Sequence, residues 1–288
     1  MSNILNITSG DTSGCLIEEA GIVGEVFVWH DIMYDGPREP GWPDEEALIA
    51  RAKFIEHETG GGLKAYDVLQ TFKEQYRKLE LASVDSRIVL WFDACLFDQS
   101  MLVHILACLY LLDISDVELI CVDKCPGIER FNGLGEMTPT QLASCYDSRI
   151  RVSEEMFRFA VAADAAFAEK DISALQKLAE MDGAPLVHVP AAAKRWLKEQ
   201  PSPETGLGQL EQLIIDALNN GCTTPLEIFK YAAGNDEPPQ YWGDTTLWSR
   251  INSLSERVPP LVKITGPGRK LPQWGNFDGL HEYKVTTA

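Results

Sequence analysis

The sequence lacks the long apolar run that a membrane-spanning helix requires. Such a helix needs about 20 consecutive apolar residues, and the longest apolar stretch here is residues 101–112. The N-terminus, Met-Ser-Asn-Ile-Leu, has neither the basic start nor the small-residue cleavage site of a signal peptide. We therefore expect a cytoplasmic protein with no membrane partner, and a buried helix at residues 101–112.

Positive charge is also scarce. The 288 residues include 25 Lys and Arg against 43 Asp and Glu, which gives a formal net charge of −18. Affinity for phosphate backbones is carried mainly by Lys and Arg, so the composition disfavours a general nucleic-acid binder. A small-molecule ligand or a protein partner fits this acidic balance better.

Familiar catalytic and nucleotide-binding signatures are missing. The chain has no G-x-G-x-x-G fingerprint, no P-loop Gly-Lys-Ser/Thr, no G-x-S-x-G and no H-E-x-x-H. Its seven cysteines are scattered, and Cys121 and Cys125 have no second pair or nearby histidine to complete a zinc site. We expect these thiols to be buried and reduced.

The first half of the chain alternates strands with helices. Apolar runs predict four strands, and apolar residues at helical spacing predict the helices between them; the strands fall at residues 4–7, 26–29, 87–93 and 117–122. The order strand, helix, strand, two helices, strand, helix, strand indicates a three-layer, Rossmann-like α/β domain with a mostly parallel sheet over residues 1–132.

The second half predicts two further parts. Residues 133–200 contain helical patterns only, and the Pro-rich segment 200–203 has the composition of a linker. Three predicted helices and two alternating segments then follow in the order of a winged helix; they lie at residues 207–219, 224–233, 244–254, 260–265 and 281–286. We expect a helical extension at 133–200 and a winged-helix-like α+β domain at 204–288.

Polar residues follow the predicted strands, at the edge where α/β sheets bind ligands. Asp11 follows the first strand, Asp31 follows the second, and Asp93 ends the third. If these three carboxylates converge, they offer oxygen ligands for Mg²⁺, which would serve hydrolysis or phosphoryl transfer by neutralising charge. Two alternatives are that the aspartates cap helices and close turns, or that they contact a ligand without a metal.

The predicted ligand-binding residues gather around these strand ends: Gly10, Asp11, Ser13, His30, Asp31, Asp93, Asp98 and Gln99. The turn from Gly10 presents backbone N–H groups suited to an anion, although a plain strand-to-helix turn explains it as well. His30 and Asp31 are the catalytic candidates. Because neighbours on a strand point to opposite faces, His30 needs a partner from another strand, such as Asp11 or Asp93. His104 and His188 are expected to be structural.

A DNA-binding role for the last part depends on few cations. Residues 201–288 hold seven Lys and Arg against ten Asp and Glu. The candidate DNA contacts are Arg250 on the predicted recognition helix, and Lys263, Arg269 and Lys270 in the hairpin. Tyr241, Trp242 and Trp274 are expected to be exposed, where they would serve a protein or a DNA partner.

Several short motifs occur in a fixed order: Gly10-Asp11, Val28-Trp29-His30-Asp31, Gly36-Pro37, Arg51-Ala52, Leu90-Trp91-Phe92, Asp98-Gln99, Gly133-Leu134-Gly135-Glu136-Met137-Thr138 and Tyr241-Trp242-Gly243-Asp244. Together they resemble the bacterial domain-of-unknown-function family 1835, whose N-terminal domain is often followed by a companion C-terminal domain. The resemblance spans most of the chain. It implies no catalytic roles, because the family has no assigned activity.

The chain departs from that family at two places. The family often has an Arg where this chain has His30, and a His-Asp pair after the third strand where this chain has Asp93-Ala94-Cys95. If the usual residues are catalytic, this member has an altered or lost activity. Three functions therefore stay open: a ligand-binding or regulatory protein, a metal-dependent hydrolase or transferase acting on a phosphate-bearing substrate, and a transcription regulator.

Overall fold

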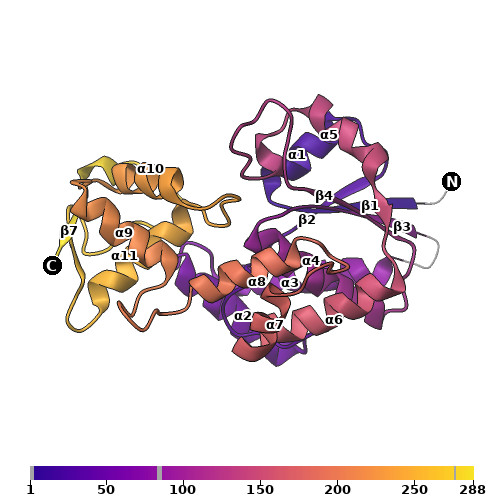
Figure 1. Ribbon diagram of the computed structural model, residues 1–288, viewed down its shortest axis with the longest axis horizontal. Helices are drawn as coiled ribbons and strands as arrows, with labels where there is room; N and C mark the ends of the chain where they lie inside the picture. The colour runs from indigo at the N-terminus through magenta and orange to yellow at the C-terminus, as the bar shows by residue number, and fades with distance from the viewer. Residues whose placement is uncertain (1–2, 83–85, 276) are drawn as a thin grey trace. The chain divides into compact units, whose positions relative to one another are not determined.

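The computed structural model describes residues 3–82, 86–275 and 277–288, and the chain forms two compact units (Figure 1). The first unit contains residues 1–51 and 69–197, and the second contains residues 52–68 and 198–288. The boundary after residue 197 lies beside the predicted linker. The helical segment predicted as a separate extension lies within the first unit, and no sequence pattern indicated that residues 52–68 join the second.

The first unit is built on a five-stranded sheet with the order β2-β1-β3-β4-β5. Its strands are β1 (Asn3–Ser9), β2 (Glu25–Trp29), β3 (Ser86–Asp93), β4 (Val117–Val122) and β5 (Ile150–Arg151). The first four are parallel, and β5 pairs antiparallel with β4. The prediction of a mixed α/β fold with a mostly parallel sheet is therefore confirmed. β5 was not predicted, because two residues are too few to show alternation.

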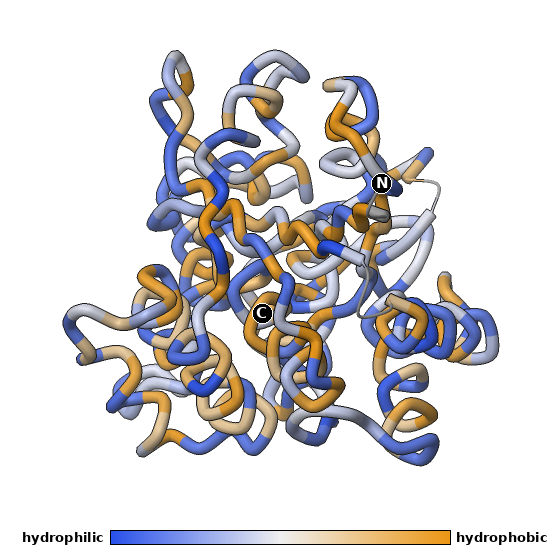
Figure 2. The backbone as a smooth tube through the Cα atoms, turned by 90° about the vertical axis from the view of Figure 1, so that its right-hand side faces the viewer, coloured by the Kyte–Doolittle hydropathy of each residue, from blue (hydrophilic) through white to orange (hydrophobic). Residues whose placement is uncertain are grey.

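The central strand β3 is buried on both faces, which explains its unbroken apolar sequence. In Figure 2, where hydrophobic residues are orange, such apolar stretches appear as orange segments near the centre of the view. One side-chain hydrogen bond joins β3 to β1: Trp91 Nε1 donates to Asn6 Oδ1 at 3.0 Å, so this buried amide oxygen is satisfied.

Helices cover both faces of this sheet (Figure 1). α1 (Asp11–Glu19) and α5 (Pro139–Cys145) lie on one face, where Ile17, Trp91 and Leu142 share a core. The other face carries α3 (Ala65–Leu81), α4 (Leu96–Leu111) and α6 (Glu154–Ala168). α4 is buried on nearly every side, which confirms the buried helix predicted there. The first unit also contains α7 (Ile172–Ala179) and nearly all of α8 (Val189–Lys198), whereas α2 (Glu45–Glu58) begins in the first unit and ends in the second.

The second unit contains three helices followed by an antiparallel strand pair, as predicted: α9 (Gln209–Asn219), α10 (Pro225–Asn235), α11 (Asp244–Glu256), β6 (Val262–Thr265) and β7 (Lys284–Thr287). The expectation of exposed aromatic residues holds for Trp274 and is wrong for Tyr241 and Trp242, which are buried. Trp242 Nε1 donates to Asp236 Oδ2 at 2.7 Å, so its polar atom is satisfied inside the unit.

Within residues 3–82, 86–275 and 277–288, every helix is too short or too polar to span a lipid bilayer.

Candidate functional site

The strand order places a topological switch point between β1 and β3. The helix after β1 is α1 and the helix after β3 is α4, and these two helices lie on opposite faces of the sheet (Figure 1). At such a point the two connections diverge and leave a crevice at the carboxyl ends of the strands, where open α/β sheets bind ligands. The residues that follow β1, β2 and β3 are therefore the candidate site.

Hydrogen bonds join the ends of β1 and β3 at this point. The Ser9 hydroxyl at the end of β1 donates to Asp98 Oδ1 in the first turn of α4. The backbone N–H of Asp93 donates to Asp98 Oδ2 at 2.6 Å, and that of Cys95 donates to Asp93 Oδ1 at 2.8 Å. All four residues are buried. The predicted residues Asp93 and Asp98 thus belong to one cluster, with Ser9 as a member that the sequence did not single out.

Burial changes the ionisation of this cluster. It raises the pKa of Asp98 well above the ordinary range, and the neighbouring Asp93 raises it further. Burial also raises the pKa of Asp93, although the N–H groups of Cys95 and Leu134 lower it in part. Each carboxyl therefore takes up a proton more readily than an exposed aspartate does. Burial raises the pKa of the Cys95 thiol well above its usual value too.

The predicted magnesium ligands are not brought together. Among the described residues, the set of three metal-capable side chains that meets is Asp93, Cys95 and Asp98, whose ligand atoms lie within 4.8 Å of one another. Mg²⁺ prefers ionised oxygen ligands and keeps several waters. Here both Asp98 oxygens and Asp93 Oδ1 already accept hydrogen bonds, and the third group is a buried thiol. This buried set does not fit Mg²⁺.

The loop after β4 closes over the cluster at Gly133. A Cβ atom at this position would lie 2.6 Å from Asp93 Oδ2, and the backbone has φ 152°. Any other residue therefore collides with the Asp93 carboxyl and strains the backbone. The first glycine of the Gly133-Leu134-Gly135 motif is required by this close approach.

His30 and Asp11 form an exposed pair on the same edge. His30 Nε2 lies 2.9 Å from Asp11 Oδ1, and the two side chains are 50% and 82% exposed. Asp11 begins α1, and Gly10 before it has φ 73°. The backbone N–H of His30 donates to Gln75 Oε1 at 2.7 Å, which fixes where β2 ends. Asp11, which follows β1, is thus one of the partners predicted for His30. Ser13, in the first turn of α1, is buried.

Asp31 has a different role from its neighbour. Its carboxylate is buried and accepts hydrogen bonds from Arg51 Nε at 2.9 and 3.0 Å and from Arg51 Nη2 at 2.7 Å. Arg51 also donates to the backbone carbonyls of Ile32 and Asp35, so the ion pair holds the loop after β2. The carboxylate of this catalytic and metal candidate is therefore engaged by Arg51 within the scaffold.

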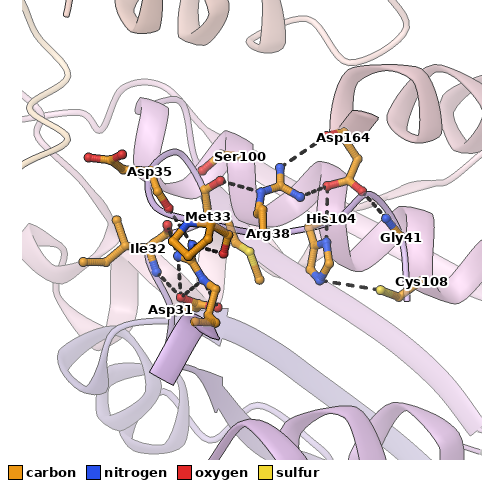
Figure 3. A network of polar contacts seen from close by, with 12 residues as sticks. Asp31, Ile32, Met33, Asp35, Arg38, Gly41, Ser100, His104, Cys108 and Asp164 are labelled. Atoms are coloured by element: carbon orange, nitrogen blue, oxygen red, sulfur yellow. Dashed lines mark hydrogen bonds and ion pairs between the residues drawn. The ribbon is translucent and has the colours of Figure 1, made fainter. Parts of the chain in front are cut away.

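A second buried network surrounds Asp164, a residue that the sequence did not single out. Its carboxylate has no exposed side-chain surface and accepts from Arg38 Nη1 at 2.6 Å, from the Gly41 N–H at 2.6 Å and from His104 Nδ1 at 3.2 Å (Figure 3). His104 Nε2 also lies 2.7 Å from the Tyr76 hydroxyl. The available signal for Asp164 was a single charged residue within the Ala-rich stretch 160–168 of α6.

The charges of this network stabilise one another. Burial lowers the pKa of His104, but Cys108 and Asp164 raise it more, to about 9. Burial raises the pKa of Asp164, but His104, Arg38 and the Gly41 N–H lower it well below its ordinary value. At neutral pH His104 is therefore protonated and donates from both ring nitrogens. The expectation that His104 is structural agrees with this geometry.

Gln99 lies in the first turn of α4. It is buried, and its Nε2 donates to the Asp93 carbonyl at 2.5 Å and to Cys121 Sγ at 3.3 Å. Its contacts are thus with the backbone and a thiol, and not with the His30–Asp11 pair.

Three of the four candidate DNA contacts lie together. Lys263, Arg269 and Lys270 line a groove of about 510 Å³ in the second unit, but Lys270 Nζ is paired with Glu256 Oε1 at 2.6 Å. Arg250 is half-buried on α11 and does not line this groove. The helix α11 itself buries six residues against its own unit, which leaves it little surface for a groove of DNA.

No model of a known protein family matches this chain, and no curated protein matches it significantly.

Proposed function

We propose that the first unit is a cytoplasmic ligand-binding and regulatory domain whose ligand binds at the switch point. The observation that carries this proposal is the hydrogen bond between Ser9 and Asp98, which joins the ends of β1 and β3 where the crevice opens. The exposed His30–Asp11 pair stands on the same edge. All seven cysteines are free, which supports a reducing compartment.

The polar groups of this edge favour a ligand that carries hydroxyl groups. Asp11 and His30 offer a carboxylate oxygen and a ring nitrogen at the surface, and both accept hydrogen bonds from hydroxyls. Asp11 repels a phosphate unless a cation lies between them. A nucleoside, or a nucleotide with a divalent cation, combines these requirements.

A thermal-shift experiment on the full chain tests this proposal. Adenosine, AMP and ATP are added singly and with Mg²⁺ or Mn²⁺, because a ligand that binds the folded state raises the melting temperature. We expect a shift in the wild type that Asp11→Ala and His30→Ala lose, while both variants melt near the wild-type temperature without ligand.

Matched controls are Asp147→Ala and His57→Ala, since these side chains are 98% and 83% exposed at other places. Both controls should keep the ligand shift. A shift that survives in Asp11→Ala, or no shift with any of these probes, contradicts the proposal.

A second candidate is a metal-dependent hydrolase or transferase. The observation that favours it is the 2.9 Å contact between His30 Nε2 and Asp11, since a carboxylate that orients an exposed imidazole is the arrangement of a general base. A phosphate-bearing substrate would need a cation such as Mg²⁺ beside Asp11. Release of phosphate from ATP that requires Mg²⁺ and is lost in His30→Ala would favour this enzyme over a binding protein.

We also propose membership of family 1835, with a winged-helix-like second unit. Motif residues that are far apart in the sequence support it by contacting each other: Asp31 pairs with Arg51, and Gly133 closes over Asp93. For the second unit the support is the order of three helices and an antiparallel strand pair. A transcription regulator has weaker support, because α11 offers little free basic surface.

A further inference from the structure

A second cavity lies beside β4, and its lining does not include the exposed His30–Asp11 pair. It has a volume of about 190 Å³, and residues of α4, β4, β5, α6 and the segment before α8 line it. None of Ser9, Asp11 and His30 is among the lining residues. We infer that this cavity binds a small uncharged molecule that has an apolar body and a hydroxyl or amide N–H group.

The size of the cavity limits the ligand. An apolar cavity of about 150 Å³ in a protein core is large enough to bind benzene. The walls here include Leu102, Leu119 and Met156, so a single ring or a short branched chain fits the volume and the surface. Larger cofactors are excluded, since drug-sized ligands need about 300 Å³ or more.

The lining favours an uncharged ligand. Among the described residues that line the cavity, none is Lys, Arg, Asp or Glu. Burial lowers the pKa of His188, only partly offset by Asp123, so its imidazole is neutral at pH 7. Burial raises the pKa of the Cys121 thiol to about 12. A charged ligand would lose its hydration without gaining an opposite charge.

Two oxygens, from Gln99 and Ser148, select the polar group of the ligand. The Nε2 of Gln99 already donates to the Asp93 carbonyl, so the acceptor that Gln99 offers to the cavity is its Oε1. The hydroxyl hydrogen of Ser148 is likewise committed to the Cys145 carbonyl at 2.7 Å. A ligand hydroxyl or amide N–H that donates to these oxygens satisfies the polar end of the cavity.

Exposed apolar residues mark the mouth. Ile150 on the short edge strand β5 and Val187 before α8 both line the cavity, and Val187 is 70% exposed. A ligand that fills the cavity covers part of this apolar surface, which adds to the free energy of binding.

The test uses benzyl alcohol as the probe, with benzoate and benzylamine as charged molecules of nearly the same shape. Binding to the full chain is followed by methyl-labelled NMR. We expect benzyl alcohol to shift the methyl signals of Leu102, Ile150 and Val187, with the signal of the exposed Ile172 unchanged, and the two charged molecules to shift none of them.

Two variants locate the binding. Val187→Arg places a long charged side chain at the mouth, and Val23→Arg is the matched control because Val23 is also 70% exposed and does not line the cavity. We expect Val187→Arg to weaken benzyl alcohol binding at least tenfold and Val23→Arg to leave it unchanged. Asp11→Ala should leave it unchanged as well, which separates this site from the one at the switch point.

Three results would overturn the inference: no methyl shifts up to the solubility limit of benzyl alcohol, equal binding of benzoate, or equal weakening in Val23→Arg and Val187→Arg.

Discussion

Two His–Asp pairs in the first unit have similar N–O distances and differ in burial and in their other partners. His30 and Asp11 are 2.9 Å apart with side chains 50% and 82% exposed, whereas His104 and Asp164 are 3.2 Å apart with side chains 2% and 0% exposed. The exposed pair leaves polar atoms facing water. The buried pair has its polar atoms occupied by Arg38, Gly41 and Tyr76. Burial, and not distance, separates a candidate binding pair from a scaffold pair.

The physical reason is the cost of removing charge from water. A buried ion is tolerated only with partners, and removal of one partner leaves the others uncompensated. An exposed pair is solvated with or without its partner and contributes little to stability. The two pairs should therefore respond to substitution in opposite ways.

The largest effect is expected for Asp164→Ala. This variant leaves the Arg38 guanidinium and the protonated His104 buried without their shared carboxylate. We expect the free energy of unfolding to fall by about 3–5 kcal/mol, as measured by urea denaturation.

Asp11→Ala is the control in the other pair. Because Asp11 is exposed, we expect the same measurement to change by less than about 1 kcal/mol. If Asp164→Ala and Asp11→Ala lost equal unfolding free energy, burial would not distinguish the two pairs.

A pH titration of stability comes next. The folded-state pKa of His104 is about 9 and its ordinary value is 6.5, so between these values the folded protein holds a proton that the unfolded chain has released. The stabilisation from His104 is full below pH 6.5 and is lost as the pH rises through about 9, by up to about 3 kcal/mol.

The comparison variant for that titration is His104→Gln, which keeps a hydrogen-bonding side chain that does not titrate. Urea denaturation from pH 6 to pH 9.5 should show a flatter pH dependence in the variant. The same slope in both proteins would mean that His104 is not protonated in the folded state.

A smaller effect is expected for Gly133→Ala. The new Cβ meets Asp93 Oδ2 at 2.6 Å, so the loop must move, at a cost of about 1–3 kcal/mol. Gly127→Ala is the control, because Gly127 has φ 88° and no atom within 4 Å of the new Cβ, so it reports backbone strain alone. If both variants lose the same stability by urea denaturation, the contact with Asp93 adds nothing.

Much of the local structure was predictable. The strands β1 to β4 and the helix α4 lie where the spacing of apolar residues predicted them. This spacing is informative because a strand or helix buries a face whose apolar residues recur at a fixed interval. Helix starts also depend on local chemistry: the side chains of Thr138 and Ser153 accept hydrogen bonds from the N–H groups of Gln141 and Met156.

The candidate site was predictable in its place and less so in its members. Because parallel strands end at one edge, the sequence located Asp11, His30 and Asp93 near the crevice. It did not show that Asp31 would turn into the scaffold toward Arg51, since adjacent residues of a strand end face different surroundings.

The sequence alone determined the elements and the edge at which polar residues gather, because these follow from short-range spacing. Only the tertiary structure decided which charges pair. Asp164 is 60 residues from His104 and 126 from Arg38, and residues 52–68 join a unit formed mostly by residues 198–288. Whether a charged side chain is paired depends on its burial and on partners from distant segments of the chain. The spacing of neighbouring residues predicts neither.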